Sequence, residues 1–176
     1  MRWRLVGFLI LSLTTSLSWA KVPPMIAQVA QEQGVPDQIF YSIVLAESRS
    51  RTQAGAKAWP WTINHRGNPH FFHTQADAYA YANMLVEQGD YSFDLGIAQM
   101  NWRWHRSRFD YDLWRALDPY ENLTAAARHL REQFDRPECN DWKIAVGCYH
   151  RPARGKADLR IADAYADRVL KIWWNL

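Results

Sequence analysis

The chain is poor in cysteine, which limits any disulfide framework. Its 176 residues contain two cysteines, Cys139 and Cys148, so at most one intramolecular disulfide is possible. If the segment between them were one continuous helix, their Cα atoms would lie about 13 Å apart, beyond the ~7 Å that a disulfide spans. A bridge therefore requires Cys139 to lie in a loop that folds back. Two unlinked, buried thiols are the alternative.

The chain also lacks long apolar runs, except at its beginning. Two arginines precede an apolar stretch from Leu5 to about Leu17, and small residues follow at 18 and 20, where a signal peptidase cuts. About a dozen apolar residues fall short of the ~20 that cross a bilayer. We therefore expect a cleaved secretory signal peptide over residues 1–20 and a periplasmic protein, rather than a retained membrane anchor. Residues 21–176 are then long enough for one domain with its own core.

Neither sign of charge is in clear excess. Without residues 1–20 the chain has 19 Lys and Arg against 18 Asp and Glu, and the two signs are interleaved. This pattern lacks the basic patch of a nucleic-acid-binding protein, so we expect no such partner. The six histidines lack His-Glu-x-x-His or comparable spacing, and no metal or other cofactor is predicted.

Aromatic residues, by contrast, are abundant. The chain has ten tryptophans, and eight of them follow residue 20, several in adjacent or alternate pairs. Sugar rings stack on such flat faces, and binding sites are commonly lined by aromatic side chains. We expect Trp59, Trp61 and Trp102 to contact a glycan.

The spacing of apolar residues predicts a mainly α-helical domain with almost no strand signal. The expected helices cover residues 36–48, 74–89, 96–102, 118–134, 141–149 and about 158–172. Thr74 and Asp77 resemble a capping box, with Asp in place of the usual Glu or Gln. Residues 49–73 lack helical period and contain two glycines and two prolines, which predicts a loop or small hairpin that acts as a lid or substrate wall.

Glu47 is the only acid that continues the apolar stripe of the helix expected over residues 36–48. It lies four residues after Ile43 and eight after Ile39. Partial burial and the negative end of the helix dipole both raise the pKa of such a carboxyl. A general acid that works near neutral pH needs this raised pKa. The alternative is a boundary glutamate that reaches solvent or the nearby Arg49 or Arg51.

Two further segments carry polar groups suited to a glycan. In the segment from Asp94 to Asn101, the amides of Gln99 and Asn101 can pair with hydroxyl and acetamido groups, although ordinary helix-start polarity would also explain them. Tyr149 ends another expected helix. It can donate to a substrate or to Glu47, or lie in the core.

Together these segments resemble the soluble-type lytic transglycosylases, which share the goose-type lysozyme fold. Glu47-Ser48 is similar to the family's catalytic Glu-Ser pair, and Gly96-Ile97-Ala98-Gln99 to its Gly-Leu-Met-Gln motif. Cys148-Tyr149-His150 stands where Ala-Tyr-Asn is usual. The stretches at 59–64 and 99–105 resemble the branch that is encoded with conjugation, pilus and secretion systems.

The resemblance implies a mainly α, lysozyme-like single domain over residues 21–176 with a small loop or hairpin insertion. It implies that Glu47 is the catalytic residue and that substrate contacts come from Ser48, Asp94, Gln99, Asn101 and Tyr149. Three positions depart from the family's pattern: Asp94 stands where serine is common, Ala98 replaces methionine, and His150 replaces asparagine. Peptidoglycan glycan strands are the implied substrate, and components of a conjugation, pilus or secretion apparatus the implied partners. We expect a monomer.

A single evident carboxylate bears on the mechanism, because most glycosidases use a pair of them. The resemblance implies that Glu47 protonates the oxygen between N-acetylmuramic acid and N-acetylglucosamine, and then takes the proton of the muramoyl C6 hydroxyl. Attack by that hydroxyl gives a 1,6-anhydro end. Two alternatives remain open: a lysozyme-like hydrolase in which Asp94 activates water, and a non-catalytic glycan-binding module of a secretion apparatus.

Overall fold

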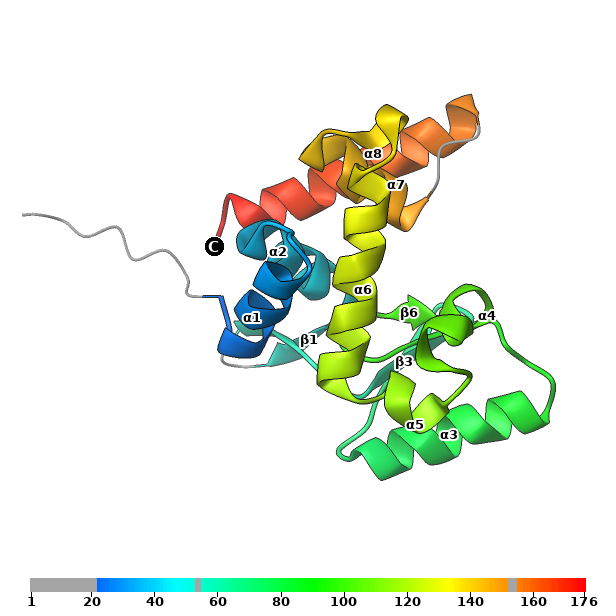
Figure 1. The fold of residues 1–176 in the computed structure, drawn as a ribbon. Coiled ribbons are helices and arrows are strands. Elements are labelled where there is room, and N and C mark those ends of the chain that lie inside the picture. The colour runs from blue at the N-terminus through cyan, green and yellow to red at the C-terminus, as the bar shows by residue number, and fades with distance from the viewer. Residues whose placement is uncertain (1–21, 53–54, 152–154) are drawn as a thin grey trace, which may run out of the picture.

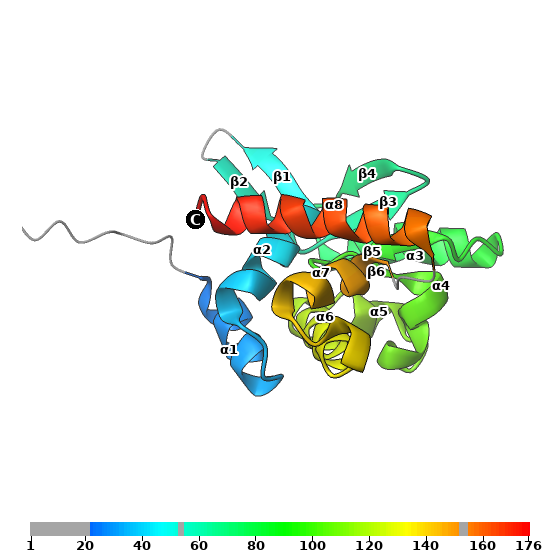
Figure 2. The same cartoon turned by 90° about the horizontal axis from the view of Figure 1, so that it is seen from above.

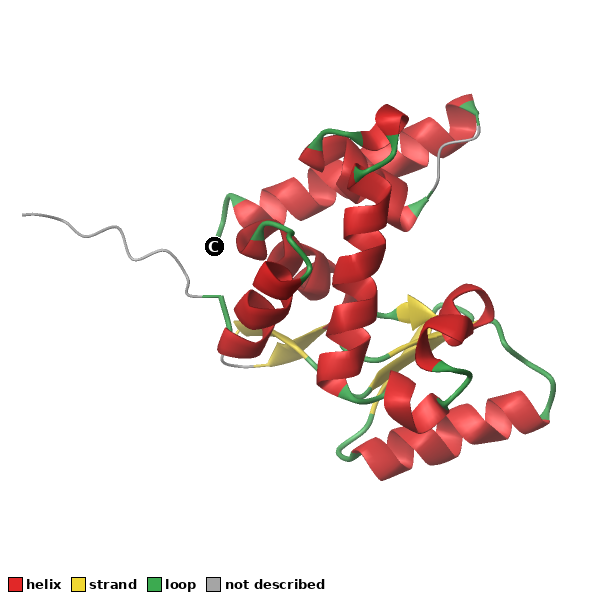
Figure 3. Cartoon of the chain, in the orientation of Figure 1, coloured by secondary structure: helices red, strands yellow, loops and turns green. Residues whose placement is uncertain are grey.

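The structure, a computed structural model, describes residues 22–52, 55–151 and 155–176, with the backbone alone for residues 49–52, 55 and 56. The expected signal peptide lies outside these ranges. The described chain is mainly helical and has a small antiparallel sheet, as the sequence predicts in outline (Figures 1 and 3). Within the same ranges, no helix combines the length and the apolar character needed to cross a membrane.

The helices agree with most of the expected segments. The long helices are α1 (Pro24–Glu32), α2 (Asp37–Ser48), α3 (Gln75–Glu87), α6 (Pro119–Phe134), α7 (Trp142–His150) and α8 (Lys156–Trp173). Shorter helical turns are α4 (Trp102–His105), α5 (Leu113–Ala116), η1 (Arg106–Phe109) and η2 (Pro137–Cys139). Of the long helices, only α1 is not predicted from the sequence. The expected Thr74 cap is confirmed, because its hydroxyl accepts from the Asp77 amide at 3.1 Å.

The strands are more numerous than the sequence predicts. The segment expected as a loop or small hairpin forms two hairpins, β1 (Arg49–Thr52) with β2 (Gly55–Ala58) and β3 (Thr62–His65) with β4 (Asn68–Phe71). Two short strands, β5 (Phe93–Leu95) and β6 (Met100–Asn101), extend the second hairpin into an antiparallel sheet of order β4-β3-β5-β6. Such short strands give no usable period-2 pattern, and β6 has only two residues.

The helix expected over residues 96–102 is wrong. Gly96 and Gln99 have φ angles of 82° and 48°, in the left-handed region, so the chain turns back from β5 into β6. Gly96 also lies against the buried amide of Asn122, where an added Cβ would be 2.3 Å from Nδ2. Glycine is therefore required here for both conformation and space. Helix begins again only at Trp102.

Helix α6 runs through the middle of the molecule and carries the core (Figure 1). Leu123 and Leu130 of α6 are fully buried, together with Phe40 and Ile43 of α2. Asn122 is also fully buried: its amide donates to Leu95 O at 3.1 Å and Ala116 O at 2.8 Å, and accepts from Ala98 N at 2.8 Å. This one side chain ties α6 to the turn between β5 and β6.

Helix α8 lies along one side of the molecule and packs against α2 and α7 (Figure 2). The approach of α7 and α8 is close because Gly147 has no side chain: a Cβ there would lie 3.0 Å from Ala162 O. Tyr165, Ala166 and Val169 bury one face of α8. The sequence thus brings the last helix against the helix that carries Glu47.

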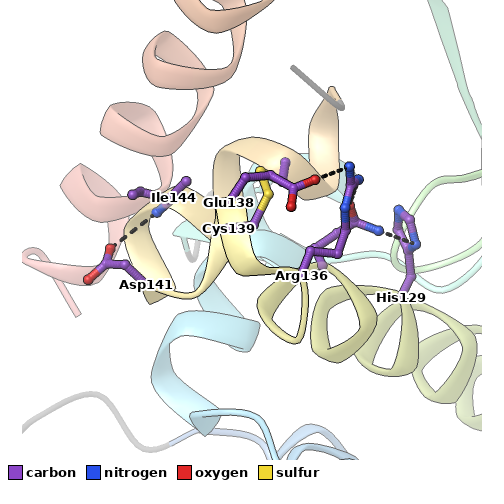
Figure 4. Close-up of a disulfide and its surroundings, with 8 residues drawn as sticks. His129, Arg136, Glu138, Cys139, Asp141 and Ile144 are labelled. Atoms are coloured by element: carbon purple, nitrogen blue, oxygen red, sulfur yellow. Dashed lines mark hydrogen bonds and ion pairs between the residues drawn. A yellow bond between two sulfur atoms is a disulfide. The ribbon is translucent and has the colours of Figure 1, made fainter. Parts of the chain in front are cut away.

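Cys139 and Cys148 form a disulfide with a Cα–Cα distance of 6.6 Å (Figure 4). The sequence requires Cys139 to lie in a segment that folds back. Cys139 does so, because it ends η2 before the chain turns back into α7. Arg136 stabilises this turn by donating to Gln133 Oε1 at 3.0 Å and to Glu138. The bridge fixes α7 one residue before Tyr149.

Removing the disulfide should destabilise the fold. The Cys139→Ala/Cys148→Ala variant should lose about 2–3 kcal/mol of unfolding free energy, the loop-closure entropy of a short cross-linked loop. This corresponds to a melting temperature lower by about 5–10 °C. Calorimetry with and without reductant checks it, since reductant should destabilise the parent and leave the variant unchanged. Equal stability of variant and oxidised parent would contradict a bridge in the folded protein.

Candidate active site

A cavity of about 640 Å³ lies where α2, the small sheet, α6 and the α7–α8 junction meet. Among the described residues that line it are five that the sequence predicts for the site: Glu47, Asp94, Gln99, Asn101 and Tyr149. They come from four elements and from the turn between β5 and β6. The volume lies in the range of pockets that hold small ligands.

Glu47 lies in the last turn of α2, at the wall of this cavity. Its Oε1 accepts a hydrogen bond of 2.5 Å from the hydroxyl of Tyr165. Burial raises the pKa of the Glu47 carboxyl to about 6, and the nearby negative charge of Asp94 acts in the same direction. The Tyr165 hydrogen bond and the charge of Arg168 both lower this pKa but do not cancel the effect of burial. The alternative contacts, with Arg49 or Arg51, concern residues whose side chains the structure does not describe.

Tyr165 is the principal site residue that the sequence does not reveal. It is a buried residue of α8, and its ring stacks on His150 with 4.2 Å between centroids. The Arg168 guanidinium lies 5.0 Å from the same ring. Burial raises the pKa of the Tyr165 hydroxyl, so it stays protonated as a donor to Glu47. A tyrosine on an apolar helix face 118 residues after the acid gives no local signal of this role.

Asp94 is a second carboxylate in the same cavity. It accepts a hydrogen bond of 2.7 Å from Asn101 Nδ2. Asn64, Asp94 and Asn101 are register partners on β3, β5 and β6, so their side chains form one polar row on one face of the sheet. Burial raises the pKa of Asp94, and the Asn101 hydrogen bond opposes this. Asp94, the residue that would activate water in the hydrolase alternative, is thus an acidic neighbour of Glu47.

Gln99 and Tyr149 line the cavity, but their side-chain donors already bond to backbone oxygens of the protein. The Gln99 amide donates to Thr62 O at 2.9 Å and to Gly96 O at 2.8 Å, which closes the turn between β5 and β6. The Tyr149 hydroxyl donates to Ala98 O at 3.4 Å, and not to Glu47. The donor to Glu47 is Tyr165 instead.

Four predicted contact residues are not among the described residues that line the cavity. Ser48 is buried and donates to Val44 O at 3.1 Å. Trp102 is 3 % exposed and stacks on Phe93. Trp59 Nε1 donates to Phe72 O at 2.7 Å, and Trp61 packs against the core. The tryptophan that does line the cavity is Trp104, which is 75 % exposed.

A pair of histidines completes the wall beside Trp104. The rings of His105 and His129 lie 4.8 Å apart. Burial, then the neighbouring His129 and Arg108, lower the pKa of His105 to about 4. Burial also lowers the pKa of His129, whose Nδ1 lies 3.4 Å from Arg108 Nη2. Arg108 is in turn paired with Glu132 at 2.5 Å. Both imidazoles are therefore neutral near pH 7.

In the part of the chain that the structure describes, no three His, Cys, Asp or Glu side chains are placed to hold a metal ion. Comparison with models of known protein families, with curated proteins and with solved structures found no match.

The raised pKa of Glu47 should make the protein less stable as pH rises. Because the folded state holds the proton up to about pH 6 and an unfolded glutamate releases it near 4.5, stability should fall across this window. The Glu47→Gln variant removes this loss and should be more stable than the parent by about 2 kcal/mol above pH 6. Below pH 4.5 the difference should disappear.

Urea unfolding at pH 4 and pH 7.5 measures this difference. Glu87→Gln, at an exposed glutamate of α3, controls for the loss of one charge. A Glu47→Gln variant that is less stable than the parent at pH 7.5 would contradict a buried, proton-holding Glu47.

Proposed function

We propose that the protein is a peptidoglycan lytic transglycosylase with a lysozyme-like fold. It cleaves the β-1,4 bond between N-acetylmuramic acid and N-acetylglucosamine and leaves 1,6-anhydro ends. One observation carries the proposal: Glu47, a carboxyl with a pKa raised to about 6, lies in the wall of a cavity that can hold sugar rings. The motif residues that resemble the family, Glu47, Gln99 and Tyr149, line this same cavity.

The first step is proton transfer from Glu47 to the glycosidic oxygen as the bond to the muramoyl C1 breaks. Glu47 becomes a carboxylate, which the Tyr165 hydroxyl and the charge of Arg168 stabilise. The positive charge that develops at C1 is stabilised by the substrate's own 2-acetamido carbonyl. Asp94 adds a negative charge in the same cavity.

In the second step the muramoyl C6 hydroxyl attacks C1, and its proton passes to the Glu47 carboxylate. The new C6–O–C1 bond closes the 1,6-anhydro ring, and Glu47 ends in the protonated state in which it began. No water is consumed. Attack within one sugar ring has the entropic advantage of an intramolecular reaction.

Hydrolysis is a second candidate, and the placement of Asp94 favours it. Glycosidases that hydrolyse usually have two carboxylates at the cleaved bond, and Asp94 lines the cavity with Glu47. In that reaction Asp94 would activate water, which would attack C1 and give a reducing end. We rank it second because the family that the sequence resembles commonly has serine at this position, and because Asp94 already accepts a hydrogen bond from Asn101.

The proposal places the enzyme in the periplasm, where peptidoglycan is found. Local opening of the wall is what a conjugation, pilus or secretion apparatus requires, and components of such an apparatus are the proposed partners. Both follow from the sequence resemblance.

Replacement of the acid tests the proposal. Glu47→Gln should lower cleavage of peptidoglycan by roughly 10²–10⁴-fold, because general acid catalysis contributes about that factor. Zymography measures the loss, and mass spectrometry of the parent's products should detect 1,6-anhydro muropeptides. Retained binding of Glu47→Gln to insoluble peptidoglycan shows that the cavity is intact.

The products separate the alternatives. Reducing ends without anhydro ends would contradict the transglycosylase and favour hydrolysis at Asp94. If the parent and Glu47→Gln both bind the wall and neither cleaves it, the protein is a binding module.

A further inference from the structure

Among the described residues, the cavity wall carries three histidines and one arginine beside its acids. Three histidines line the cavity, His105, His129 and His150, and burial is the main cause that lowers each of their pKa values. They are therefore neutral near pH 7. Of the described residues in the lining, Arg151 is then the only one with a positive charge at this pH, whereas Glu47, Asp94 and Asp158 are acids.

One contact holds the Arg151 side chain in place and leaves other donors of its guanidinium without a partner among the described residues. Its Nε donates to Asp158 Oδ1 at 2.6 Å, and this contact joins the end of α7 to the first turn of α8. The Arg151 side chain is 53 % exposed. No hydrogen bond from either Nη atom to another described residue is present. A guanidinium offers five N–H donors in a fixed plane, so the Nη groups can still receive a ligand.

The two Nη groups of Arg151 suit a carboxylate ligand. Two parallel N–H donors match the two oxygens of a carboxylate, and a positive charge strengthens both hydrogen bonds. The neutral histidines and Trp104 elsewhere in the wall suit an uncharged sugar ring. The cavity thus combines groups for a neutral sugar with one site for an anion.

We propose that Arg151 binds a carboxylate carried by the muramoyl residue, and so makes the protein prefer acidic glycan strands to neutral ones. The inference rests on the proposed function, because it takes peptidoglycan as the glycan. Two carboxylates have the required chemistry: the lactyl group, which is free once the stem peptide is removed, and the acidic residues of the stem peptide itself.

Binding to the Glu47→Gln protein tests this without cleavage of the ligand. Calorimetry compares three soluble probes: strands with stem peptides, strands freed of peptide by an amidase, and a neutral N-acetylglucosamine hexamer. Arg151→Gln in this background should weaken binding of at least one acidic probe about fivefold or more, the scale of one charge-assisted hydrogen bond at a partly exposed site. Affinity for the neutral hexamer should not change.

The controls separate charge from structure. Arg160→Gln, at an exposed arginine of α8 outside the described lining, should leave every affinity unchanged. Arg151→Lys keeps the charge and should restore part of the preference. The acidic probe that responds identifies the source: amidase-treated strands indicate the lactyl carboxylate, and peptide-bearing strands alone indicate the stem peptide.

Equal loss of affinity for all three probes, or no loss for any, would overturn the inference. These outcomes do not depend on cleavage, because they measure binding in a variant that lacks the acid. A parent enzyme that binds acidic strands through Arg151 but cleaves none would sink the proposed function and leave the inference standing.

Discussion

The structure of the site depends on one hydrogen bond between the first and last parts of the described fold, from Tyr165 of α8 to Glu47 of α2. Burial makes the Glu47 carboxyl hold its proton, whereas Tyr165 and Arg168 favour its release. The balance gives a pKa of about 6, near the pH at which an acid must both give and regain a proton. Both effects are needed. Burial without the hydrogen bond would raise the pKa of Glu47 further and make it a weaker acid, whereas the hydrogen bond without burial would lower the pKa and leave Glu47 ionised.

Three structural constraints bring the rest of the cavity to this pair. Asn122 binds the turn between β5 and β6 to α6, which places Asp94 and Gln99 opposite α2. The absence of a side chain at Gly147 allows α7 to approach α8. The disulfide of Cys148 anchors α7 at the residue before Tyr149, which lines the cavity. Each is a packing or covalent feature away from the acid, so changes there should alter the site without touching Glu47.

The sequence predicts what depends on near neighbours along the chain. The helix that carries Glu47 follows from apolar spacing and a proline start, and the α3 helix from its Thr74 cap. Burial of Glu47 follows from its place on that apolar stripe. Contacts between distant segments are not predictable in this way. Tyr165 has the pattern of a core residue, and Trp104 is indistinguishable in sequence from the buried Trp102 because a turn of four residues has no measurable period. The strands β5 and β6 are too short to show a period, and the turn between them is held by the distant Asn122.

Direct titration of the Glu47 carboxyl tests the central claim most closely. Carbon-13 NMR of the side-chain carboxyl should give a pKa of about 6 in the parent protein. In Tyr165→Phe it should rise further, because the hydrogen bond that favours the carboxylate is lost. Tyr149→Phe, at a cavity tyrosine that does not donate to Glu47, is the matched control and should leave it nearly unchanged. A parent pKa near 4.5 that Tyr165→Phe does not move would contradict the account.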